Sequence, residues 1–192
     1  MELKFLMILF LATLLLAPVS SASVAQQNTY STFVKTSCSS VTYSAVCLKT
    51  LLPYASAVKT NPLKLVNVAL YTTLRSANAT LITVTNLSKS KQITKWESAI
   101  LKDCIGHIKD SMDEIKDSIK AISRLPKSAD KHFVISNAQT WTSAAITNEN
   151  SCLDGFADGK ISSTIKKKIK NSVVSLARVS SNALYLINNL TV

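Results

Sequence analysis

Residues 96–122 read WESAILKDCIGHIKDSMDEIKDSIKAI and decide the fold class. Apolar residues recur here at alternating spacings of four and three, at Leu101, Ile105, Ile108, Met112, Ile115, Ile119 and Ile122. This spacing is typical of the narrow apolar seam of a bundle helix, and polar residues fill nearly every other position. Thr94 followed by Glu97 predicts a capping box at the start of the helix, and Pro126 marks its end.

Three further segments carry an apolar stripe on one side only. One begins at the cap and first-turn proline Asn61-Pro62, one runs from about Asp130 to Asn148, and the last begins near Ser163. Their stripes are Val66, Leu70, Ala77, Leu81 and Val84; Val134, Ala138, Trp141 and Ala145; and Ile165, Ile169, Val173, Leu176, Ala183, Ile187 and Leu190. Each stripe must be buried against the others, and short connections favour antiparallel neighbours. The sequence predicts an all-α protein in which residues 61–192 form an up-and-down four-helix bundle.

Ahead of the bundle, residues 25–60 contain two short helical patterns with Cys38 and Cys47 near the bend between them. We expect this segment to form an N-terminal helical hairpin. The chain has only three glycines and four prolines, which is low for a sheet protein because its turns use both. With no internal repeat, residues 25–192 are expected to form one domain.

The first residues are typical of an export signal. Lys4 is followed by an apolar run from Phe5 to Ala17 that is too short to span a bilayer, and small residues follow it. We predict a signal peptide over residues 1–22, with Ala25 as an alternative cleavage site. The mature protein is therefore expected to be secreted and to have no membrane anchor.

Secretion determines how the four cysteines are interpreted. In an oxidising compartment, Cys38, Cys47, Cys104 and Cys152 are expected to form two disulfides, and the sequence by itself leaves three pairings open. Three glycosylation sequons fit the same route, at Asn78, Asn86 and Asn189.

The net charge of +11 predicts attraction to acidic polymers. Nucleic acid is such a polymer, but the export signal argues against it. Four lysines, at positions 166, 167, 168 and 170, favour a solvated helix start over a dedicated polyanion site.

No catalytic or metal-binding constellation is recognisable. His107 and His132 have no metal-ligand spacing and are interpreted as surface residues, and no Gly-x-Ser-x-Gly or phosphate-binding glycine loop occurs. Trp141 is expected in the core, and Trp96 is expected to pack near a helix start. The single carboxylate cluster alternates with Lys109, Lys116 and Lys120, as an ion-paired exposed helix face does; it consists of Asp110, Asp113, Glu114 and Asp117. We therefore predict no enzyme activity and no cofactor or metal.

Four stretches around the cysteines resemble the plant invertase and pectin methylesterase inhibitor family. They are Cys38-Ser-Ser-Val-Thr-Tyr-Ser-Ala-Val-Cys47-Leu, Leu101-Lys-Asp-Cys104, Gln139-Thr-Trp-Thr-Ser-Ala-Ala-Ile-Thr147 and Cys152-Leu-Asp-Gly-Phe156, with Ser181-Asn182-Ala183-Leu184 near the end. The resemblance implies a four-helix bundle with an N-terminal hairpin, and the pairs Cys38 with Cys47 and Cys104 with Cys152. It also implies a protein that binds one enzyme molecule and covers its substrate cleft in the cell wall, or apoplast.

The resemblance favours pectin methylesterase as the target. The invertase-inhibitor class carries Pro-Lys-Phe between the second and third bundle helices, whereas Pro126-Lys127 is followed here by Ser128. Invertase remains the alternative target. Gly106 departs from the acidic residue that many relatives have at this position. A further alternative is a protein that binds acidic pectin directly through its basic surface.

Contact with the enzyme is expected from residues outside the apolar stripes of the second and third bundle helices, because only a broad helical face offers the area of a stable interface. The candidates are Lys109, Asp113, Lys116, Asp117, Ser136, Gln139, Thr140, Ser143 and Thr147.

Overall fold

The computed structural model describes residues 17–157 and 161–191, so most of the predicted signal peptide lies outside the described residues. The hairpin comprises α2 (Ala17–Ser39) and α3 (Ser44–Leu51), followed by the short η1 (Leu52–Tyr54) and α4 (Ala55–Val58). The long helices are α5 (Pro62–Ser88), α6 (Lys95–Arg124), α7 (Lys131–Asp154) and α8 (Ser163–Asn188), and η2 (Leu125–Lys127) lies between α6 and α7. The described part of the chain contains no strand, and the predicted all-α class is confirmed.

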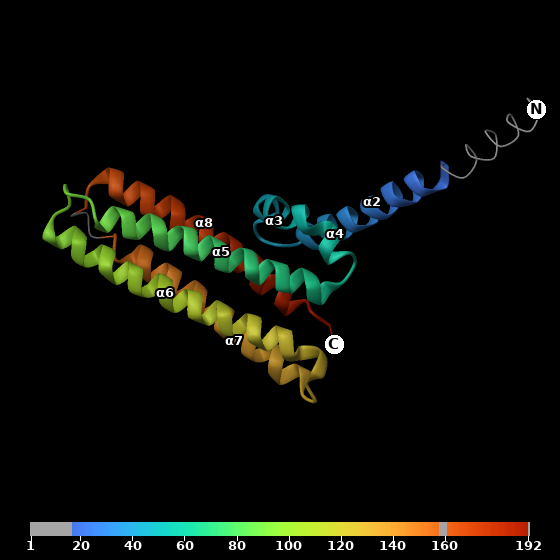
Figure 1. Cartoon of the computed structure of the whole chain (residues 1–192). Coiled ribbons are helices and arrows are strands. Elements are labelled where there is room, and N and C mark those ends of the chain that lie inside the picture. Colours follow the sequence, from blue (N-terminus) through green and yellow to red (C-terminus); the bar gives the residue numbers. More distant parts are fainter. Residues whose placement is uncertain (1–16, 158–160, 192) are drawn as a thin grey trace, which may run out of the picture.

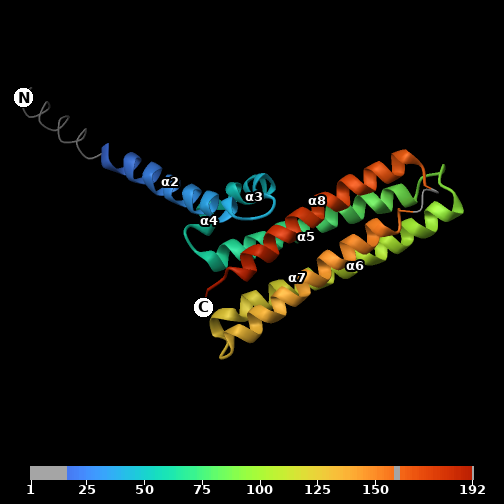
Figure 2. The same cartoon turned by 180° about the vertical axis from the view of Figure 1, so that it is seen from behind.

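The four long helices form an up-and-down bundle (Figure 1). Each of α5 and α7 packs against both α6 and α8, so α5 and α7 lie diagonally opposite one another. The view from behind shows α2 extending away from one end of the bundle, beside α3 and α4 (Figure 2). Within the described residues, none of the helices combines the length and hydropathy needed to cross a membrane.

Each long helix begins at a side-chain cap. Asn61 Oδ1 accepts a hydrogen bond from the amide of Lys64 at 3.0 Å, and Asp130 Oδ1 accepts one from the amide of Phe133 at 2.8 Å. Thr94 and Glu97 form the predicted capping box, and Ser162 caps α8. Because a good cap stabilises a helix by about 1 kcal/mol, these residues fix where the helices start.

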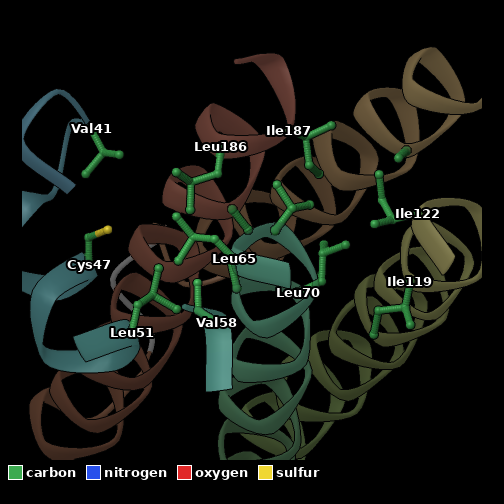
Figure 3. Close-up of a cluster of buried hydrophobic side chains, with 14 of the residues drawn as sticks. Val41, Cys47, Leu51, Val58, Leu65, Leu70, Ile119, Ile122, Leu186 and Ile187 are labelled. Atoms are coloured by element: carbon green, nitrogen blue, oxygen red, sulfur yellow. The ribbon is translucent and has the colours of Figure 1, made fainter. Parts of the chain in front are cut away.

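Two clusters of buried apolar side chains make up the core. The larger joins the hairpin to the bundle: Leu51 and Val58 pack with Leu65 and Leu70 of α5 and with Ile187 of α8 (Figure 3). The smaller lies around Cys104 and Cys152 and includes Leu101, Ile108, Ile169, Val173 and Leu176. Burial of each Leu or Ile is worth about 1.5 to 3 kcal/mol, so the stripes do support a core.

The hairpin is held by one covalent and one polar link. Cys38 and Cys47 form a disulfide with their Cα atoms 5.6 Å apart. The buried side chain of Asn182 on α8 binds the backbone of Tyr43 twice: its Oδ1 accepts from the Tyr43 amide at 3.2 Å, and its Nδ2 donates to the Tyr43 carbonyl at 2.9 Å. The start of α3 is therefore fixed to the bundle.

The structure leaves several residues of the predicted core only half-buried, among them four of the other stripes: Leu81, Val134, Ile165 and Leu190. Trp96 is 51% exposed at the start of α6, and Trp141 is half-buried at the edge of the larger cluster instead of inside the core. Ile105 and Met112 are also only half-buried. Ser111 and Ser118 of α6 are fully buried instead, because this helix also turns a second side toward α7 and fills it with small residues.

Candidate functional site

The side of α6 that faces α7 is lined by Cys104, Ser111 and Ser118. Cys104 forms a disulfide with Cys152 of α7, with the Cα atoms 4.4 Å apart, as the resemblance implied. Ser118 Oγ lies 3.0 Å from Thr142 Oγ1 and 3.2 Å from the carbonyl oxygen of Ala138. These contacts fix the two antiparallel helices in one register, so α6 and α7 present a rigid surface.

Glu149 is a buried carboxyl group at the centre of the bundle. Its Oε1 accepts hydrogen bonds from Ser111 Oγ of α6 at 2.9 Å and from Ser180 Oγ of α8 at 2.7 Å. Among the described residues, no partner lies within hydrogen-bond distance of its Oε2. Burial raises the pKa of Glu149 to about 7, although the hydrogen bonds from Ser180 and Ser111 oppose this shift. A neutral carboxyl at acidic pH therefore joins three helices.

Four of the predicted contact residues form one line along α7. Ser136, Thr140, Ser143 and Thr147 are all exposed and lie opposite the buried positions Ala138 and Ala145. Thr140 Oγ1 donates to the Ser136 carbonyl at 2.9 Å, and Thr147 Oγ1 donates to the Ser143 carbonyl at 3.1 Å. We call these four residues the hydroxyl stripe. The stripe is uncharged and consists of small residues. The hydroxyl protons of its two threonines are already donated to backbone carbonyls. Gln139, the fifth candidate on this helix, is half-buried beside it.

The candidates on α6 do not join the hydroxyl stripe. Ser111 and Ser118 face α7. Lys109 and Lys116 lie two positions before these serines, and Asp113 lies two positions after Ser111. Since each residue turns about 100° around the helix, these three lie about 160° away from the side that contacts α7. Asp117 lies about 100° around the helix from Ser118, so it does not face α7 either. The nine candidates therefore fall on two separate faces.

The carboxylate cluster of α6 is largely an ion-paired helix face, as predicted. Lys116 Nζ lies 2.7 Å from Asp113 Oδ1, and Lys120 Nζ lies 2.8 Å from Asp117 Oδ1. The hydrogen bond and charge of Lys116 lower the pKa of Asp113. Partial burial, and then the charges of its acidic neighbours, raise the pKa of Glu114. Exposed pairs of this kind are screened by solvent and contribute little to the stability of the fold, so their main effect is on the charge pattern of the surface.

The remaining polar groups offer no reactive site in the part of the chain that is described. His107 Nε2 lies 3.6 Å from Asp103 Oδ2, one turn away on α6, and His132 is exposed. No group of three His, Cys, Asp or Glu residues could hold a metal ion there, and no cysteine is free. The predicted glycosylation residues are all exposed, Asn78 and Asn86 on α5 and Asn189 at the end of α8; their glycosylation stays a prediction.

The comparisons with known proteins agree with the resemblance. Residues 32–186 match the profile of the family described as plant invertase/pectin methylesterase inhibitor. The "21 kDa protein" of Daucus carota is 37% identical over 98% of this chain and 96% of its own length. Pectinesterase inhibitor 11 of Arabidopsis thaliana is 39% identical over 81% of this chain and 79% of its own length.

The solved structures add a likeness of fold. A mutant form of a pectin methylesterase inhibitor from Arabidopsis superposes with a TM-score of 0.66 at 16% sequence identity, covering 82% of this chain and 97% of that one. The family match begins within α2 and spans the rest of the hairpin and nearly all of the bundle, and members of the family are inhibitors. This chain therefore belongs to the plant invertase/pectin methylesterase inhibitor family and is an inhibitor, not an enzyme.

Proposed function

We propose that the protein inhibits a pectin methylesterase of the plant cell wall by binding one enzyme molecule and covering its substrate cleft. The observation that carries the target is the similarity to proteins named pectinesterase inhibitors, among them number 11 of Arabidopsis thaliana. Within the family, Ser128 after Pro126-Lys127 favours this target over invertase. The predicted signal peptide supports secretion to the wall, where the enzyme's substrate lies.

The contact face that the structure supports best is centred on the hydroxyl stripe of α7. A stable complex buries about 1,600 Å² in total. A helix of 24 residues is about 36 Å long, so α7 with the edges of its neighbours offers enough area. Since the stripe carries no charge, binding it costs little desolvation of ions. The disulfide behind it keeps α7 in place, which limits the entropy lost on binding.

The target is tested by titrating the purified protein into pectin methylesterase and acid invertase side by side. We expect loss of esterase activity with an endpoint at one inhibitor per enzyme, and no effect on invertase. Inhibition of invertase alone would reject the proposed target. Hydrolysis of methyl esters by the protein itself would reject the assignment as an inhibitor.

The contact face is tested by a matched pair of double variants. Thr140→Arg with Ser143→Arg places two long charged side chains on the hydroxyl stripe, and we expect it to abolish inhibition while helicity and melting temperature stay unchanged. Ala79→Arg with Ile82→Arg is the control, because both residues are exposed, three apart, on the diagonally opposite helix α5. Inhibition retained by the α7 variant, or lost equally in both, would reject this face.

A further inference from the structure

One end of the bundle collects lysines from three segments. They come from the connection after α5, the first residue of α6 and the first turns of α8. This set, which we call the basic end, is Lys89, Lys91, Lys95, Lys166, Lys167, Lys168 and Lys170. We propose that the basic end binds a linear acidic polysaccharide, the de-esterified pectin that a methylesterase produces. The identity of the polymer rests on the proposed function, whereas binding at this surface does not depend on inhibition.

Two contacts bring the lysines together. The amide of Ser162, at the start of α8, donates to Glu97 Oε1 in the first turn of α6 at 2.8 Å. Ser172 Oγ of α8 donates to Thr80 Oγ1 of α5 at 3.1 Å, and the two helices run in opposite directions. The connection after Ser88 therefore lies level with the first turn of α8. In Figure 1 this end lies on the left, at the far end of the bundle from the hairpin.

The charges of the basic end are not neutralised within the described residues. The three ion pairs found there, His107 with Asp103 included, all lie within α6 between residues 103 and 120. Glu97, the carboxylate in the first turn of α6, already binds backbone groups. It accepts hydrogen bonds from the amides of Ser162 and Thr94, which lower its pKa. Lys166 reaches only the carbonyl oxygen of Ala157, at 3.5 Å. The other six lysines are exposed.

Folding stability does not account for this arrangement. Lys166, Lys167 and Lys168 lie near the start of α8, where the helix dipole disfavours positive charge and where no acidic residue precedes them in the first turn. Lys166 and Lys170 are also four apart, which places like charges side by side on the helix surface. These positions therefore cost stability in the free protein, and an anionic partner would remove that cost.

A polyuronate carries the charge opposite to that of the basic end. Its degree of methyl esterification determines which stretches of the polymer bind. Each free uronate carries one carboxylate, so a de-esterified stretch presents a row of anions to lysines spread over one end of the molecule. A methyl ester removes that charge, so binding should follow the degree of de-esterification. Trp96 follows Lys95 and is 51% exposed, and its flat ring suits the apolar face of a sugar. The inhibitor would then accumulate where the esterase has already acted.

The two surfaces do not compete for the same residues. The hydroxyl stripe runs from Ser136 to Thr147 along α7, whereas the basic end starts beyond the last turn of that helix, which ends at Asp154. The polymer could therefore hold the inhibitor while α7 contacts an enzyme. This separation also allows the two activities to be tested independently.

The test compares two variants that each lose four positive charges. The end variant combines Lys89→Gln, Lys91→Gln, Lys167→Gln and Lys168→Gln. The control variant combines Lys35→Gln, Lys49→Gln, Lys64→Gln and Lys127→Gln, all exposed and all outside the basic end. The measured quantities are the dissociation constant for polygalacturonate at low salt and the salt concentration that elutes each protein from the immobilised polymer. Highly methyl-esterified pectin is the second polymer.

We expect the end variant to bind polygalacturonate at least about tenfold more weakly and to elute at lower salt, because each lysine near an anionic surface contributes separately. The control variant should stay within about threefold of the unchanged protein. Equal weakening of both variants would mean that net charge alone acts, and would overturn the proposal. Equal binding to highly esterified pectin would overturn it too.

Inhibition is measured on the same three proteins. We expect all three to titrate pectin methylesterase to the same endpoint, because the lysines replaced lie outside the hydroxyl stripe. If none inhibits the esterase while polygalacturonate binding follows the expected order, the proposed function fails and the basic end stands. If all inhibit but none binds the polymer, only the present proposal fails.

Discussion

Ser180 Oγ donates to Glu149 Oε1 across 2.7 Å, so a buried carboxyl of α7 meets a buried hydroxyl of α8 in the centre of the bundle. Ser111 of α6 donates to the same oxygen, whereas Oε2 has no hydrogen-bond partner among the described residues. Hydroxyl donors suit a carboxylate, but two of them do not replace the hydration of a full charge. The bundle therefore accommodates Glu149 best when it is protonated.

The first prediction concerns pH. The pKa of Glu149 rises from 4.5 to about 7 in the folded protein, so the folded state binds more protons than the unfolded state between these values. The stability contributed by this group is complete at pH 4 and is lost as pH rises toward 7, by about 3 kcal/mol in total. We expect a lower melting temperature at pH 8 than at pH 5. Glu149→Gln, which cannot ionise, should show a much smaller fall, and an unchanged pH dependence in this variant would contradict the assignment.

The second prediction compares the disulfides. Cys38 and Cys47 are 9 residues apart, and Cys104 and Cys152 are 48 apart. Because a longer closed loop restricts the unfolded chain more, replacing both members by serine should cost about 4 kcal/mol for Cys104–Cys152 and about 2.6 kcal/mol for Cys38–Cys47. Urea unfolding of the two double variants measures the difference. A larger loss on removal of the hairpin disulfide would contradict this order.

The third prediction concerns Gly106, in the interior of α6. A Cβ atom added there would meet no atom within 4 Å beyond its chain neighbours and the adjacent backbone of α6, so Gly106→Ala gains helix propensity without a clash. We expect stabilisation by about 0.5 to 1 kcal/mol in urea unfolding. Gly155→Ala, at the end of α7, is the matched change and should have a smaller effect because it lies outside a helix interior. Destabilisation at Gly106 would show that the backbone there needs glycine.

The fourth prediction concerns the anchor of the hairpin. Asn182→Ala removes both hydrogen bonds to the backbone of Tyr43. The partly buried Tyr43 amide loses its partner, whereas the Tyr43 carbonyl still accepts from the amide of Cys47. We expect a loss of about 1 to 3 kcal/mol, with faster hydrogen exchange in α3 than in α6 and α7. Exchange that rises equally in all helices would mean that the contact supports the whole bundle instead.

The fifth prediction concerns the two faces of α6 and α7. Lys109→Gln with Lys116→Gln changes the side of α6 that points away from α7, so inhibition should be unchanged although the pair between Lys116 and Asp113 is lost. Titration against pectin methylesterase measures this. A loss as large as that expected for Thr140→Arg with Ser143→Arg would place the contact on this outer side of α6.

The sequence predicted the bundle because its signals are local. The seam from Leu101 to Ile122 and the caps at Asn61 and Thr94 depend on neighbours within one turn of helix. Both caps form, and the seam is buried except at Ile105 and Met112. The disulfide pairing needed the family resemblance, since spacing by itself left alternatives open.

What the sequence did not predict depends on contacts between helices. Glu149 was not singled out. It follows Thr142 and Ala145 at helical spacing in a line of otherwise small, uncharged residues, and this is the one signal that could have found it. Its partners Ser111 and Ser180 lie 38 and 31 residues away. Likewise, the division of the candidate residues into two faces appears only when Cys104 and Ser118 show which side of α6 meets α7.

The α6 and α7 pair is closed at both ends, by the connection through η2 at one end and by the disulfide Cys104–Cys152 at the other. Residues 104 to 152 thus form a covalent ring. Proteolytic cleavage between Lys127 and Lys131, where exposed lysines flank the turn, would open the ring but release no fragment. The nicked protein would gain only the mass of the one water molecule used in the cleavage, and it would separate into two pieces on a denaturing gel only after a reductant was added.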